Sequence, residues 1–92
     1  MKRLHYSSRF KKDFKKYKQN PSKVESLKKI LKLLVEEEVI PKENNPHTLK
    51  GDYKGCWECH IEDDFLLIWI DEDVINLLRL GSHSELFGKN RR

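Results

Sequence analysis

Four side chains of the second half could together carry out chemistry on a phosphodiester. His47, His60 and His83 each bring an imidazole that titrates near neutral pH, so one can take a proton from an oxygen while another returns one. Arg79 stays charged and can hold a phosphate through two hydrogen bonds as negative charge develops. In RNA the 2′-hydroxyl is a built-in nucleophile, so such a set needs neither a metal ion nor a protein nucleophile. A single histidine is more often structural, so the hypothesis depends on whether the fold gathers these residues.

The elements that must position them are three predicted strands, at about 56–61, 64–70 and 74–80. The turns between these runs are short and acidic, which forces antiparallel hairpins. Residues 65–70 are apolar on both faces of the pleat, so we expect them to form the central strand.

This strand order brings the polar residues to one edge of the sheet. His60 and Asp64 lie at the same end of the first hairpin, and the second hairpin returns Arg79 and His83 to that end. His47 precedes them in a Pro-, Asn- and Gly-rich stretch, 40–54, which we expect to be a long loop.

The first half predicts a short strand followed by two helices. Residues 2–6 alternate in polarity as a strand does, and Ser7 or Ser8 can cap the first helix. Ser22 with Glu25 is typical of a capping box, which predicts a second helix from there to about Glu38. The order β-α-α-β-β-β predicts one α+β domain over residues 1–92, an antiparallel sheet with both helices on one face.

Charge and composition narrow the classes of partner. The longest apolar run is too short to span a bilayer and no signal peptide is visible, so we expect a cytoplasmic protein without a membrane partner. Residues 1–50 hold 14 basic and 6 acidic side chains, whereas 51–92 hold 5 and 9. The basic half is typical either of a protein that binds a polyanion or of well-solvated helices.

Other motifs give weaker evidence for a function. Cys56 and Cys59 with His60 match the haem-attachment pattern, but strand alternation points the two thiols to opposite faces. The same geometry argues against a zinc site and a disulfide. Ser82 and His83 are adjacent, which is poor geometry for a nucleophile and its base, and no nucleophile elbow surrounds them.

Four stretches resemble the YafQ branch of the RelE/ParE toxin superfamily, and the resemblance covers nearly the whole chain. They are His47-x-Leu-x-Gly51, Trp57-Glu-Cys-His-Ile61, Asp64-x-Leu-Leu-Ile-Trp69 and Leu78-Arg-Leu-Gly-Ser-His-Ser-Glu-Leu-Phe87. The resemblance implies a RelE-like fold and a type II toxin that enters the ribosomal A site and cleaves mRNA without a metal ion or other cofactor. It also implies an antitoxin partner, which we expect to be acidic and partly disordered when free.

The resemblance also assigns residues. The catalytic set falls on His47, His60, Asp64, Arg79, His83 and Phe87, with Asp64 orienting a histidine or moving a proton and Phe87 packing against a base. Lysines would hold ribosomal RNA phosphates, and we assign this role to Lys11, Lys12, Lys15, Lys16, Lys50 and Lys54. Which histidine is the base stays open.

Two departures from the family pattern concern affinity rather than reaction class. Trp57 stands where some relatives carry arginine, which removes a possible phosphate contact, and Phe65 stands where a tryptophan is expected. The alternative function is a non-catalytic module, either a gyrase-type inhibitor of the ParE branch or a domain that only binds RNA or an antitoxin.

Overall fold

The computed structural model describes residues 1–88 and holds a five-stranded sheet in the order β1-β5-β4-β3-β2. The basic tail after Gly88 lies outside the described residues. The strands are β1 (Arg3–Tyr6), β2 (His47–Thr48), β3 (Trp57–Glu62), β4 (Phe65–Asp71) and β5 (Val74–Gly81). The three hairpin strands are confirmed to within a residue or two of their predicted ends.

The predicted antiparallel sheet is wrong for its first strand. β1 runs parallel to β5, whereas β2, β3, β4 and β5 pair antiparallel. No hairpin joins β1 to β5, because both helices and three strands lie between them in sequence, so no tight turn dictates the direction of β1.

β4 is the central strand, as its apolar composition predicts, and it supports two hydrophobic clusters. Phe65, Leu67 and Trp69 pack on the helix side, and Leu66 and Ile68 pack on the other side. The strand cysteines divide in the same way, Cys59 with the first cluster and Cys56 with the second. Both thiols are free, and burial raises the pKa of Cys59 to about 12.

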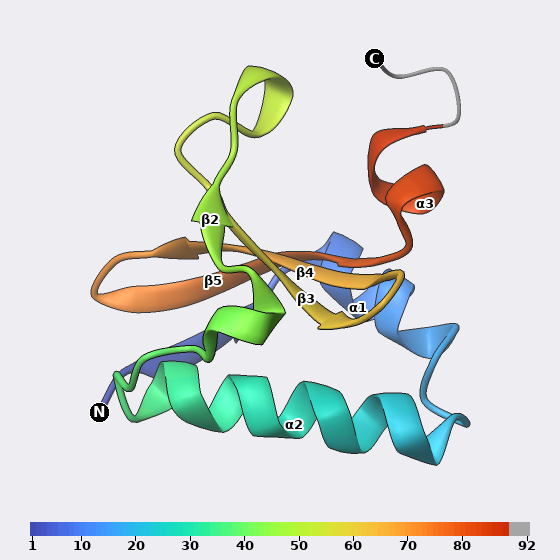
Figure 1. The fold of residues 1–92 in the computed structure, drawn as a ribbon, viewed down its shortest axis with the longest axis horizontal. Helices are drawn as coiled ribbons and strands as arrows, with labels where there is room; N and C mark the ends of the chain where they lie inside the picture. The colour runs from blue at the N-terminus through green and yellow to red at the C-terminus, as the bar shows by residue number, and fades with distance from the viewer. Residues whose placement is uncertain (89–92) are drawn as a thin grey trace.

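The helices α1 (Ser8–Lys15) and α2 (Pro21–Val35) both contribute to the first cluster, and α2 lies along one side of the sheet in Figure 1. Ser7 caps α1 through its side chain, as predicted. The capping box expected at Ser22 is wrong, because α2 begins two residues earlier on an Asn20 cap with Pro21 at its first position. Ser22 donates instead to Glu62 of β3.

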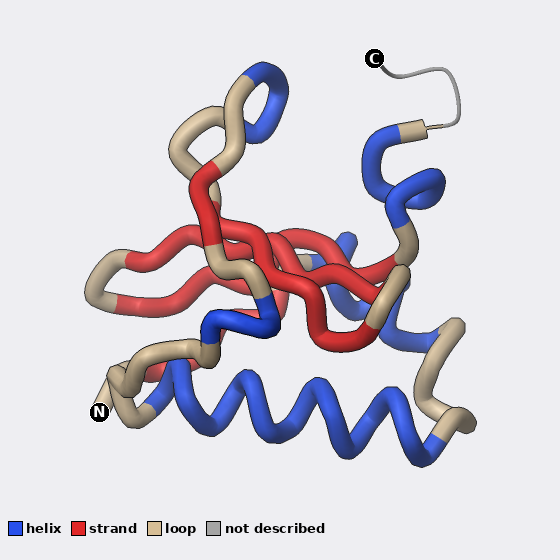
Figure 2. Tube along the Cα trace, viewed as in Figure 1, coloured by secondary structure: helices blue, strands red, loops and turns tan. Residues whose placement is uncertain are grey.

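The structure also contains short elements in places where the sequence predicts loop or no regular structure. The stretch expected as loop contains two 3₁₀ turns, η1 (Lys42–Asn44) and η2 (Gly51–Tyr53), on either side of β2. A short helix, α3 (His83–Phe87), follows β5 and is closed by a capping box between Ser82 and Glu85. Figure 2 shows the β2–η2 segment and α3 rising on the side of the sheet away from α2.

β5 contains a bulge that simple alternation does not predict. Ile68 of β4 pairs with Arg79 and Trp69 pairs with Leu77, so Leu78 is an extra residue. As a result Leu77 and Leu80, three positions apart, both join the helix-side cluster, whereas Leu78 joins the other. No helix within residues 1–88 is long and apolar enough to cross a membrane.

Candidate active site

A row of ionisable side chains lies on the sheet face opposite α2. Glu58 and His60 are two positions apart on β3, so they point to the same face. β2 pairs alongside and places His47 directly opposite Glu58. Asp64 lies in the turn between β3 and β4, and His83 begins α3.

His83 and Asp64 form the tightest contact of this row. Asp64 Oδ1 lies 2.7 Å from His83 Nδ1 and also accepts from the His83 backbone N–H at 2.9 Å. These two hydrogen bonds lower the pKa of Asp64, and the bond from the backbone has the larger effect. This carboxyl is therefore ionised at neutral pH. An ionised carboxylate only accepts, so Nδ1 of His83 carries the hydrogen and Nε2 is left for another partner.

His60 and Phe87 lie on either side of this imidazole. The rings of His60 and His83 meet edge to face with centroids 5.5 Å apart, and the ring of Phe87 is 6.4 Å from that of His83. Of the four residues predicted to converge at this edge, His60, Asp64 and His83 therefore do so, with Phe87 beside them.

Glu58 links the remaining histidine to the group, and sequence reasoning missed it. Its Oε1 lies 3.3 Å from His47 Nε2 and 3.9 Å from His60 Nε2. Only 3% of Glu58 is exposed, and a carboxylate is buried in this way only when it is paired. The signal was available, because an acid two residues before His60 in a strand must share its face.

His47 lies between two acceptors. Its Nδ1 is 2.8 Å from the carbonyl oxygen of Asn45, and its Nε2 faces the Glu58 carboxylate. A carbonyl oxygen only accepts, so Nδ1 carries a hydrogen. Its Nε2 lies within ion-pair distance of the Glu58 carboxylate, so Glu58 and Asn45 together fix the orientation of the ring.

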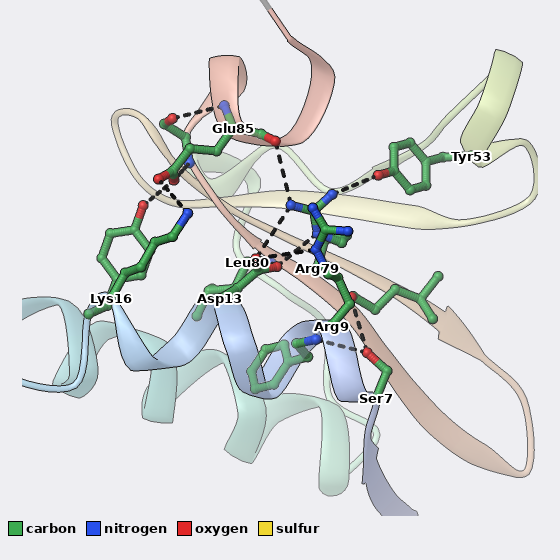
Figure 3. A network of polar contacts seen from close by, with 12 residues as sticks. Ser7, Arg9, Asp13, Lys16, Tyr53, Arg79, Leu80 and Glu85 are labelled. Atoms are coloured by element: carbon green, nitrogen blue, oxygen red, sulfur yellow. Dashed lines mark hydrogen bonds and ion pairs between the residues drawn. The ribbon is translucent and has the colours of Figure 1, made fainter.

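Arg79 is not in contact with the histidines in the described residues and serves a different network (Figure 3). Its Nε donates to Asp13 Oδ2 at 2.8 Å, its Nη1 to the Tyr53 hydroxyl at 3.2 Å and its Nη2 to the Glu85 carbonyl at 3.5 Å. Burial opposes the charge, but the bonds to Asp13 and Tyr53 outweigh it and raise the pKa of Arg79. Tyr53 in turn packs edge to face on Phe87, 5.8 Å away, so the two networks meet at these rings.

Glu85 attaches α3 to the segment that follows α1. Its carboxylate accepts from the Tyr17 hydroxyl, from the Ser82 backbone N–H at 2.9 Å and from Lys16 Nζ at 3.4 Å. The bond from Tyr17, opposed by partial burial, lowers the pKa of Glu85, and burial together with the same bond raises that of Tyr17. The helix that carries His83 and Phe87 is thus held by residues far away in sequence.

The predicted RNA-binding lysines do not form one surface. Lys11 and Lys15 line a groove of about 550 Å³ between α1 and α2, together with Lys18 and Lys28. The floor of this groove is apolar and includes Phe10, Phe14, Val24, Leu27 and Leu31. Lys50 and Lys54 instead flank η2, beside Tyr53, and Lys12 is exposed on α1.

Trp57 has a structural role, because it packs against the helix-side cluster. Its ring stacks on Trp69 of β4, with centroids 6.3 Å apart. No group of three or more His, Cys, Asp or Glu side chains within the described residues is arranged to hold a metal ion.

Comparison with known proteins agrees with this architecture. The chain is 30% identical over 87 residues to the mRNA interferase toxin YafQ of Escherichia coli K12, covering 92% of this chain and 95% of that protein. The structure matches the E. coli DinJ-YafQ complex at a TM-score of 0.85 and 30% identity, over 96% of this chain and 100% of that one. It also matches a copper-bound mutant toxin from Helicobacter pylori at a TM-score of 0.85 and 39% identity. That match covers 95% of this chain and 100% of the other.

The fold and these relatives define the chain as a toxin of a bacterial type II toxin–antitoxin system. The model of the family described as "Bacterial toxin of type II toxin-antitoxin system, YafQ" matches residues 2–88, so the chain belongs to the YafQ family. The E. coli relatives are named mRNA interferases, a class of endoribonuclease.

Proposed function

We propose that this toxin is a ribosome-dependent mRNA endoribonuclease that cleaves by attack of the RNA 2′-hydroxyl, without a metal ion. The observation that carries the proposal is the continuous row from His47 through Glu58, His60 and His83 to Asp64 on one face of the sheet. Because the ribosome is the place of action, the proposal also puts the protein in the cytoplasm.

His83 is the proposed base. Asp64 holds its Nδ1–H and stabilises the positive charge that forms when Nε2 takes a proton. With that proton removed, the 2′-oxygen attacks the neighbouring phosphorus and the bond from phosphorus to the 5′-oxygen breaks. The products are a 2′,3′-cyclic phosphate and a 5′-hydroxyl.

His47 is the proposed acid. Its Nε2 faces Glu58, and a hydrogen carried on Nε2 can be given to the leaving 5′-oxygen. His60 lies between the two, in ring contact with His83 and near Glu58, where it can stabilise charge on the phosphate.

Arg79 and Phe87 complete the proposed site. Four contacts occupy the Nε and Nη2 hydrogens and one of the Nη1 hydrogens of Arg79, so one Nη1 hydrogen is left for a phosphate oxygen. The ring of Phe87 lies against Tyr53 and His83 at the mouth of the site, where a base can stack.

Two surfaces suit the two partners. Lys50 and Lys54, on the site side, would contact ribosomal RNA phosphates. The apolar groove with a lysine rim between α1 and α2 fits an acidic, amphipathic antitoxin segment that orders on contact. The E. coli relative forms a complex with DinJ, which supports an antitoxin partner here.

The product chemistry tests the proposal. Cleavage on ribosomes should yield a 2′,3′-cyclic phosphate, and a 2′-deoxy nucleotide at the cleavage site should abolish it. A product without the cyclic phosphate, or cleavage of the deoxy substrate, would contradict attack by the 2′-hydroxyl. Growth arrest that survives both His83→Ala and Arg79→Ala would instead indicate a non-catalytic toxin.

A further inference from the structure

Asp13 of α1 is a buried carboxylate to which neither the family resemblance nor the proposed mechanism gives a role. It is 4% exposed, although it lies on the most basic helix of the chain. A charge in such a place needs partners, and Asp13 has several. Oδ2 accepts from Arg79 Nε at 2.8 Å and from the Leu80 backbone N–H at 2.9 Å, and Oδ1 lies 3.4 Å from Arg79 Nη2.

The contact with Leu80 replaces a missing strand. β1 pairs with β5 only from Val74 to Leu77, so within residues 1–88 the edge of β5 away from β4 has no neighbouring strand beyond Leu77. Two residues of the α1 segment take that place: Ser7 donates its hydroxyl to the Leu78 carbonyl at 3.1 Å, and Asp13 accepts from Leu80. Asp13 therefore fixes the backbone of β5 at the bulge, just before the chain enters α3.

The contacts with Arg79 fix a side chain as well. Because Asp13 takes the Nε–Nη2 edge of the guanidinium, that edge cannot hold a phosphate through two hydrogen bonds. Nη1 is turned toward Tyr53 (Figure 3), and the ring of Tyr53 contacts Phe87. The orientation of the charge at the site is thus set from α1, on the other side of β5.

We infer that Asp13 is a positioning residue of the active site: it acts through Arg79, and through the β5–α3 junction that carries His83. The effect on cleavage rests on the proposed function. The claim that Asp13 orients Arg79 and the β5–α3 junction does not depend on it. A positioning role predicts loss of the chemical step with binding retained, since a displacement of about 1 Å can cost roughly 10²-fold in rate.

The test compares Asp13→Asn, which keeps the shape of the side chain but not its charge, with Glu25→Gln, which removes an exposed carboxylate from α2. Single-turnover cleavage of ribosome-bound mRNA should fall about 10- to 100-fold for Asp13→Asn. The affinity for ribosomes and a cooperative unfolding transition should be retained, and Glu25→Gln should behave as the wild type. Unchanged cleavage, or a loss of affinity that accounts for the whole defect, would overturn the inference.

A double-substitution cycle separates positioning from general destabilisation. Arg79→Lys keeps the charge but loses the planar fork, and Asp13→Asn should cost little more in that background. Equal costs in both backgrounds would show that Asp13 does not act through Arg79.

The Nε–H resonance of Arg79 in a ¹⁵N-labelled sample gives a readout without cleavage. It should be protected from exchange in the wild type and lose that protection in Asp13→Asn. Equal protection in the two proteins would overturn the inference even if the protein proves not to be a nuclease. Inactive wild-type protein that shows the expected difference in protection would contradict only the proposed function.

Discussion

At the scale of single residues, each histidine of the site is defined by its acceptors. His83 has Asp64 on Nδ1, and His47 has a carbonyl on one nitrogen and Glu58 on the other. This difference in partners is what separates a proposed base from a proposed acid, although the three side chains are chemically the same.

Removal of the imidazole of His83 or of His60 should slow cleavage strongly and leave the fold intact. We expect His83→Ala and His60→Ala to lower the single-turnover rate by about 10²–10⁴, because each removes a proton-transfer or charge-stabilising group. Their side chains are 55% and 30% exposed, so the core does not depend on them. His5→Ala, on the exposed part of β1, is the matched control. Unfolding of either site variant would indicate a structural histidine instead.

Glu58 gives a second prediction at this scale. Glu58→Gln keeps the size of the side chain but removes the charge between His47 and His60, so both imidazoles lose their common partner. We expect cleavage to fall by roughly 10²-fold, as for other groups that hold catalytic residues in place. Wild-type activity in this variant would show that Glu58 is not part of the site.

The sequence predicts the residue types of the site better than their connections. Hairpin geometry brings His60, Asp64 and His83 together without further information. The partners of Arg79 were not predictable, because the bulge at Leu78 turns its side chain and its main acceptor lies 66 positions earlier. Long-range side-chain pairs of this kind leave no local signal in the sequence.

At the scale of elements, α3 is the helix whose position depends most on the contacts of a charged side chain, Glu85. It is five residues long and buries only Leu86, so packing alone holds it weakly. The remaining stabilisation of α3 comes from Glu85, which binds Tyr17, Lys16 and the backbone N–H of Ser82. The sequence contains the capping-box pattern at Ser82 and Glu85, but not the evidence that Tyr17 would reach it.

This dependence predicts a loss of stability in acid. The pKa of Glu85 is lower in the folded chain than its ordinary value of about 4.3, so its contribution is present above that pH and is lost as the pH falls through the folded value. The melting temperature of the wild type should fall between pH 5 and pH 3. Glu85→Gln should start lower at pH 7 and show a shallower fall.

Glu25→Gln is the control for the acid titration, since Glu25 is exposed on α2. It should keep the wild-type dependence. Equal slopes for Glu85→Gln and the wild type would show that Glu85 does not hold α3. Asp64, whose pKa is also lowered, accounts for part of any slope that remains.

The central position of β4 in the sheet was predictable from its composition, whereas the direction of β1 was not. β4 is apolar on both faces, which places it in the centre whatever surrounds it. The direction of β1 depends on how α1 and α2 cross the sheet, and no pattern within residues 2–6 records that.

At the scale of the whole molecule, positive charge is divided between two sides. Lys18 and Lys28 line the groove between α1 and α2, whereas Lys50 and Lys54 flank η2 beside the site. Composition shows only that the first half is basic. The fold assigns these charges to different surfaces, which allows two partners to be distinguished.

Two matched charge reversals test this division. Lys50→Glu with Lys54→Glu should weaken ribosome binding and lower its salt slope by about two, and leave antitoxin binding nearly unchanged. Lys18→Glu with Lys28→Glu should do the opposite and weaken the antitoxin complex. Both variants reverse two charges, so net charge cannot explain a difference between them. Equal losses in both assays would contradict the division.

The most direct test of the account is mRNA cleavage in a purified translation system, with wild type beside His83→Ala and with ribosomes present or absent. We predict cleavage only by the wild type and only with ribosomes. Cleavage of free RNA would contradict the ribosome dependence, and cleavage by His83→Ala at the wild-type rate would contradict the central claim that this row of imidazoles carries the chemistry.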